Sequence, residues 1–225
     1  MLKEVSIPNG VAKIGTCAFR DCDNLTNVEL PEQMIAIGAA AFSRCQKLMK
    51  IIIPKGLLKI ADSTFDGCNC LQTINIPSSV KQIGNMSFSC CRNLKNISIP
   101  EGVISIGKEA FMGCTGMTQV EVPRSLMDVG IAAFQFCNIR RFIGPLASRD
   151  GRCLIVNGEI KAFATHEAPR TYSVQEGVTS IGEYAFSCDE LVKVILPSSV
   201  ISIKKDAFTK DSLFADAVIV EKESK

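Results

Sequence analysis

Cysteine and histidine are the residues of this sequence with the greatest capacity for chemistry, as thiolate nucleophiles, disulfide partners or metal ligands. The 225 residues include eleven cysteines and one histidine, His166. Six cysteines recur at intervals of 23 residues, with Cys188 equivalent to them in a later segment: Cys22, Cys45, Cys68, Cys91, Cys114 and Cys137. A column of equivalent cysteines is typical of small side chains buried in a core. We therefore predict inert core thiols.

Disulfides and metal sites are not expected from these thiols. Equivalent side chains in stacked units lie about 4.8 Å apart, the spacing of neighbouring strands, whereas a disulfide prefers a Cβ separation of about 3.8 Å. The cysteines outside the column form no Cys-x-x-Cys pair that would suit zinc: Cys17, Cys70, Cys90 and Cys153. We predict no metal and no cofactor.

An enzyme is also disfavoured. A nucleophile needs a base and a group that orients the base, and His166 is the only histidine available. The sequence has no G-x-S-x-G, P-loop or dinucleotide fingerprint. Carboxylates such as Glu109 and Asp128 are scattered over variable positions. We expect no catalytic residues, and a hydrolase is the least favoured function.

A 23-residue repeat must position all these residues. Two residue types mark it: Pro8, Pro31, Pro54, Pro77, Pro100 and Pro123, and Phe19, Phe42, Phe65, Phe88, Phe111 and Phe134. A period of this length predicts a solenoid. Within a unit we expect a strand ended by proline, as over residues 25–30, and a second short strand, as over 103–107. Residues such as 108–114 predict a helical turn, so the fold class is an α/β repeat with parallel stacking.

The chain is expected to be one repeat domain over residues 1–225. The repeats cover 1–144 and 174–219, with an insertion at 145–173 and a charged, frayed tail at 220–225. Within the insertion, two apolar runs flank Asn157 and Gly158, a pair that predicts a β-hairpin with a tight turn.

Composition narrows the possible partners. Lys plus Arg number 25 and Asp plus Glu 23, so the basic surface needed for nucleic acid is missing. The apolar runs are too short for membrane insertion. The first residues do not resemble a signal peptide and already occupy repeat positions, so we expect any signal peptide or anchor to lie outside this chain.

The units resemble the BspA-like, or Treponema-type, leucine-rich repeats, with the form L-x-x-(V/I)-x-(I/L)-P-x-x-(V/L)-x-x-I-G-x-x-A-F-x-x-C. Eight units conform, with departures such as Ala61 for glycine and Gln175 for proline. The resemblance implies a right-handed solenoid with a parallel sheet on its concave face. It also implies a secreted or surface protein of a bacterium, without catalytic residues, that acts in adhesion or protein recognition.

Outward strand positions vary between units and are the best binding candidates: Asn27, Lys50, Thr73, Asn96, Gln119, Arg141 and Lys193 in one column, and Glu29, Ile52, Asn75, Ser98 and Glu121 in the other. The insertion adds Arg149, Arg152, Asn157, Lys161 and His166. The expected partner is a protein or glycan on a host or neighbouring cell. The columns lack Tyr and Trp, the usual binding anchors, so a structural spacer that projects another domain is the alternative. The oligomeric state is left open.

Overall fold

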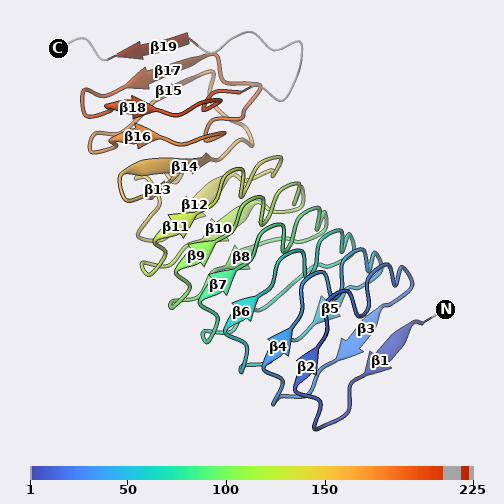
Figure 1. Cartoon of the computed structure of the whole chain (residues 1–225). Coiled ribbons are helices and arrows are strands. Elements are labelled where there is room, and N and C mark those ends of the chain that lie inside the picture. Colours follow the sequence, from blue (N-terminus) through green and yellow to red (C-terminus); the bar gives the residue numbers. More distant parts are fainter. Residues whose placement is uncertain (1, 210–218, 223–225) are drawn as a thin grey trace.

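The computed structural model describes residues 2–209 and 219–222, which wind as a solenoid with the chain ends at opposite ends of the stack (Figure 1). Most coils contribute one short strand to each of two rows, and strands of one row pair mainly in parallel. The first row contains β1 (Glu4–Ser6), β3 (Asn27–Glu29), β5 (Lys50–Ile51), β8 (Ile97–Ser98), β10 (Gln119–Glu121), β12 (Arg141–Ile143), β15 (Thr171–Ser173), β17 (Lys193–Leu196) and β19 (Ile219–Lys222). The second row contains β2 (Lys13–Ile14), β4 (Ala36–Ile37), β6 (Lys59–Ile60), β7 (Gln82–Ile83), β9 (Ser105–Ile106), β11 (Asp128–Val129), β14 (Glu159–Phe163), β16 (Ser180–Ile181) and β18 (Ser202–Ile203), while β13 (Cys153–Val156) pairs with β14.

The register of the first row follows the sequence period. Asn27 pairs with Lys50, and Val28 with Ile51. Val28 is buried while Asn27 is exposed, because successive side chains of a strand point to opposite faces. This alternation places the repeated aliphatic residues inside and the variable residues outside.

The helical turn expected over residues 108–114 is wrong, and no helix occurs in the described part of the chain. Glu109 and Gly113 have φ angles of 55° and 72°, a left-handed conformation that interrupts any right-handed helix. Alternate amides point along the solenoid instead. They donate to the next coil, from Glu109 N to Ile131 O (3.0 Å), from Phe111 N to Ala133 O (2.8 Å) and from Gly113 N to Gln135 O (2.8 Å). The described architecture is therefore a β-solenoid.

The phenylalanines form a stack through the core. Adjacent rings from Phe19 to Phe134 have centroids 5.2 to 5.8 Å apart and are tilted by no more than 14°. The stack ends where Phe134 meets Phe142 edge to face, at 75°. Parallel stacking resumes between Phe186 and Phe208, so the aromatic core has two separate parts.

The expected hairpin is present, with Asn157 and Gly158 at φ angles of 52° and 78°, as a tight hairpin turn requires. It is not an appendage, however. Its strand β14 pairs in parallel with β16 and so takes a place in the second row. Leu154 packs in the N-terminal core and Phe163 in the C-terminal core. We call residues 153–163 the septum hairpin, because it separates these two cores.

Two expected boundaries need correction. Strand β15 lies inside the proposed insertion, yet it pairs with β17 as a repeat strand. Its buried Tyr172 occupies the place of an aliphatic residue, and it lies 22 rather than 23 residues before Val194. The tail prediction is wrong for Val220, Glu221 and Lys222, which pair with β17. Residues 223–225 lie outside the described residues.

Candidate binding surface

The first-row columns form a continuous series of outward positions. Gln119 and Lys193 are half-buried, and the other ten predicted column residues are exposed. Gln119 lies beside Arg141 and Glu121 beside Ile143. Sequence reasoning missed Thr171 and Ser173, which lie beside Lys193 and Ile195. The spacing of 22 rather than 23 residues between Tyr172 and Val194 could have identified these two positions.

The first row opens between β5 and β8. Here Thr73 makes one isolated bridge to Lys50, and the described chain forms no first-row strand between β5 and β8. Ile74 is only half-buried, although its neighbours in the column, Ile51 and Ile97, are each 3% exposed. This segment therefore packs less closely against its neighbours than the equivalent strands do.

Backbone hydrogen bonding also lapses at this opening. In later coils Ile99 N donates to Glu121 O (2.9 Å) and Val122 N to Ile143 O (2.8 Å). The equivalent amides of Ile53 and Ile76 donate no backbone hydrogen bond to the next coil within the described chain. Both residues are almost fully buried, and neither amide has a backbone acceptor in the described chain.

A groove of about 590 Å³ occupies the opening. We call it the coil-four groove. Ile52, which is 70% exposed, and Asn75 line it, so the structure brings two of the predicted column residues together. Its remaining lining is Glu32, Ile53, Pro54, Lys55, Ile76, Pro77, Ser78, Ser79 and Pro100.

Two of the candidate residues in the insertion make side-chain hydrogen bonds to backbone carbonyls elsewhere in the chain. The guanidinium of Arg152 donates to the carbonyls of Ala164 (3.2 Å), His166 (2.9 Å) and Glu167 (3.1 Å). The side-chain amide of Asn157 donates to Met127 O (3.0 Å). Arg149 is exposed, and its backbone amide donates to the side chain of Gln175. Arg152 and Asn157 therefore brace the septum hairpin.

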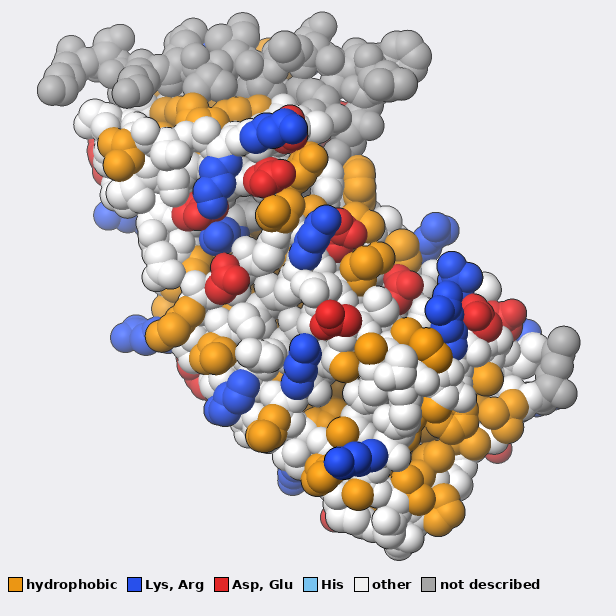
Figure 2. Space-filling model, in the orientation of Figure 1, with side chains coloured by type: hydrophobic (Ala, Val, Ile, Leu, Met, Phe, Trp, Pro, Cys, Tyr) orange, Lys and Arg blue, Asp and Glu red, His pale blue; other side chains and the backbone are white. Residues whose placement is uncertain are grey.

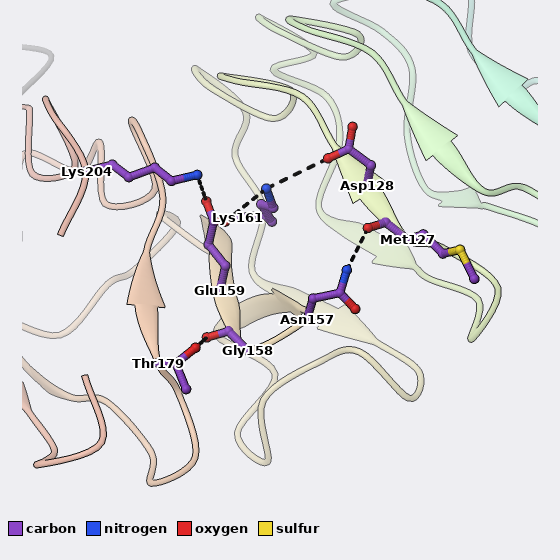
Figure 3. A network of polar contacts seen from close by, with 8 residues as sticks. All are labelled: Met127, Asp128, Asn157, Gly158, Glu159, Lys161, Thr179 and Lys204. Atoms are coloured by element: carbon purple, nitrogen blue, oxygen red, sulfur yellow. Dashed lines mark hydrogen bonds and ion pairs between the residues drawn. The ribbon is translucent and has the colours of Figure 1, made fainter. Parts of the chain in front are cut away.

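Lys161, in strand β14 of the septum hairpin, belongs to an ionic network (Figure 3). Its ammonium is 3.3 Å from Glu159 and 3.9 Å from Asp128, and Lys204 approaches Glu159 at 2.8 Å. Burial acts to raise the pKa of Glu159, but the hydrogen bond from Lys204 and the charge of Lys161 outweigh it and lower the pKa. The network joins coils on both sides of the hairpin.

His166 lies in a groove of about 500 Å³ with Glu167, Cys137 and Cys188. Its side chain is 31% exposed. Nε2 lies 3.4 Å from a Glu167 oxygen, and no hydrogen bond to either thiol is found in the described structure. Burial raises the pKa of Cys188 to about 11, which keeps this thiol protonated and weakly nucleophilic near neutral pH.

The cysteine column lies in the core, where Cys45, Cys68, Cys91, Cys114 and Cys137 are buried. Cys22, in the first coil, is half-buried. Burial raises the pKa of Cys45 to about 12, and it also raises the pKa values of Cys68, Cys91 and Cys114. These thiols are packing residues at neutral pH.

Surface charge is mixed. On the face shown in Figure 2, Lys and Arg side chains are scattered among Asp and Glu side chains. Across residues 2–209 and 219–222, no group of three or more His, Cys, Asp or Glu side chains is arranged to hold a metal ion. The same residues include no helix able to cross a membrane.

The profile of the BspA type leucine rich repeat region matches residues 1–97, 36–148 and 155–222, in six copies. Among solved structures, a leucine rich cell surface protein of Faecalibacterium prausnitzii A2-165 is similar, with 27% identity and a TM-score of 0.78 over 100% of this chain and 61% of that one. A leucine rich repeat protein of T. pallidum shows 29% identity and a TM-score of 0.52 over 66% of this chain and 77% of its own.

The pneumococcal vaccine antigen PcpA shares the fold, with 16% identity and a TM-score of 0.59 over 97% of this chain and 50% of its own. A comparison with curated proteins gave no match. The chain spans about three fifths of the F. prausnitzii structure, since it covers 61% of that chain.

Proposed function

The chain belongs to the BspA-type leucine-rich repeat family, and from this premise we propose that it is a non-enzymatic recognition module. It acts at the surface of a bacterium or outside it, and it binds a protein partner through the first-row columns. The cell-surface description of the F. prausnitzii relative supports this location.

One observation carries the proposal: the inside of the coils is uniform while the outward columns vary. Val28, Ile51 and Ile97 repeat an aliphatic residue at a buried position. Beside them the exposed residues change from Asn27 to Lys50 and onward to Arg141. A solenoid core needs uniform residues for stacking, whereas a recognition surface needs a specific, varied pattern.

The chemistry of the chain supports a non-enzymatic role. Cys188 has a raised pKa, although it lies in the same groove as His166, and a catalytic cysteine needs a lowered one. The ammonium of Lys161 is held in ion pairs with Asp128 and Glu159. Neither group is prepared for acyl transfer.

The test is capture of proteins from host-cell surface extracts on the immobilised chain. Lys50→Glu with Arg141→Glu reverses two charges on the columns. The matched control, Lys13→Glu with Lys59→Glu, makes the same change at exposed residues of the second row. We expect the column variant to lose the captured protein and the control to retain it. Equal capture by both variants would contradict the proposal, and no capture by the unaltered chain would favour a spacer.

A further inference from the structure

Resting on this proposed function, we infer that the coil-four groove binds an extended peptide segment of the partner. The segment places an aliphatic side chain beside Ile52, and its main chain pairs with the amides of Ile53 and Ile76. The groove is thus the anchor point, and the charged columns on either side of it set the partner's orientation.

The unpaired amides are the first argument. Ile53 and Ile76 are 3% and 4% exposed, and their N–H groups have no backbone acceptor in the neighbouring described coil. Buried backbone donors are almost always paired. Strand addition is a general way for proteins to use unpaired backbone groups, because a peptide main chain supplies carbonyl oxygens at regular intervals.

The apolar walls are the second argument. Ile52 is the most exposed aliphatic residue of the first row whose side chain is described, at 70%. Pro54, Pro77 and Pro100 line the same groove and present hydrocarbon without an N–H donor. This lining favours an aliphatic side chain. The groove has no aromatic residue, so it offers no aromatic face against which a ring could stack.

Charge at the groove sets the flanking chemistry of the peptide. Glu32 and Lys55, of opposite sign, both line it. A complementary peptide carries a basic residue toward Glu32 and an acidic residue toward Lys55, because opposed charges favour one orientation across an interface. The expected ligand is therefore an aliphatic residue between a basic and an acidic one.

Selection from a displayed library of random peptides about ten residues long tests this inference. The selected peptides are then measured on Ile52→Asp and on the control Leu58→Asp. Leu58 is 65% exposed and belongs to the same coil, but it does not line the groove. We expect Ile52→Asp to weaken binding by about tenfold or more, because it buries a charge in the contact. Leu58→Asp should bind as the unaltered chain does.

Two further readouts sharpen the test. Amide hydrogen exchange of Ile53 and Ile76 should slow when a selected peptide binds. Glu32→Lys with Lys55→Glu should select peptides with the basic and acidic residues interchanged. Either no enrichment of peptides or equal binding to Ile52→Asp and Leu58→Asp would overturn the inference. Protein capture that still depends on Lys50 and Arg141 would then leave the proposed function standing.

Discussion

The thiol of Cys91 donates its hydrogen to the carbonyl oxygen of Phe65 in the preceding coil, over 3.1 Å. The same bond recurs down the stack, from Cys45 to Phe19, Cys68 to Phe42, Cys114 to Phe88 and Cys137 to Phe111. A cysteine is small enough for this buried column and still offers a weak donor. The repeated cysteine thus tethers each coil to the aromatic position of the coil before it.

Alkaline pH should destabilise the protein through these thiols. The pKa of Cys45 is raised from 9.0 to about 12, so the folded state keeps its proton where the unfolded state loses it. The stabilisation is complete below pH 9 and declines as the pH rises toward 12, by about 1.4 kcal/mol per pH unit for each such thiol. Urea unfolding between pH 8 and 11 measures this slope.

The matched comparison for the pH effect is Cys45→Ala with Cys91→Ala. We expect this variant to be less stable at pH 7 but to lose less stability between pH 9 and 11, because two buried thiols are gone. If the variant lost stability with rising pH as steeply as the unaltered protein does, the pH effect could not be assigned to the buried thiols. A charged thiol reagent should label the exposed Cys17 in the native protein before any of the buried cysteines.

Phe88→Ala should lower the free energy of unfolding by about 3 to 5 kcal/mol, because it removes a fully buried ring from the stack. Phe136→Ala is the control, since that ring is 49% exposed. The control should change stability by less than about 1 kcal/mol. Equilibrium unfolding in urea measures the loss of stability for each variant. Equal losses for Phe88→Ala and Phe136→Ala would contradict the stacked core.

Gly158→Ala should destabilise more than Gly177→Ala. Both glycines have positive φ angles, 78° and 88°, so both substitutions carry the same type of backbone strain. Only at Gly158 would a new Cβ meet another group, 2.7 Å from Thr179 Oγ1. Thermal unfolding should therefore give the lower midpoint for Gly158→Ala. A lower midpoint for Gly177→Ala would argue against close packing of the hairpin turn.

Lys161→Met should cost about 1 to 2 kcal/mol, between the values for exposed and buried ion pairs, because Lys161 is 17% exposed beside the half-buried Glu159. The exposed pair of Lys205 with Asp206 is the comparison, and Lys205→Met should change stability by less than about 0.5 kcal/mol. Since the pKa of Glu159 is lowered, its stabilisation is present above pH 4.5 and is lost as the pH falls below that value. Glu159→Gln should flatten this acid dependence in urea unfolding.

The repeat period was sufficient to predict the stacking, the register and the buried phenylalanines. Residues 27–29 and 50–51 pair with the expected partners because the core requires equivalent residues to coincide. The period could not distinguish a helical turn from the observed alternating turns. That distinction depends on amides such as Phe111 N, which bond to a neighbouring coil rather than within their own.

The candidate surface was predicted only in part. Alternation identified Ile52 and Asn75 as outward positions, but the opening of the first row is a local loss of pairing at Ile53 and Ile76. The residue types at these two positions do not predict this loss of pairing. Likewise, Asn157 and Gly158 predicted a turn, whereas the position of the hairpin between two cores depends on contacts of Leu154 and Phe163 with distant residues.

The septum hairpin also has a consequence for how the molecule loses its structure. In a repeat stack, unfolding spreads from coil to neighbouring coil through their shared interfaces. Here the ring stack from Phe19 ends at Phe134, and a different set of contacts begins at Phe163. We expect the hairpin to limit the spread of unfolding, so that one end of the solenoid stays folded when the other end unfolds.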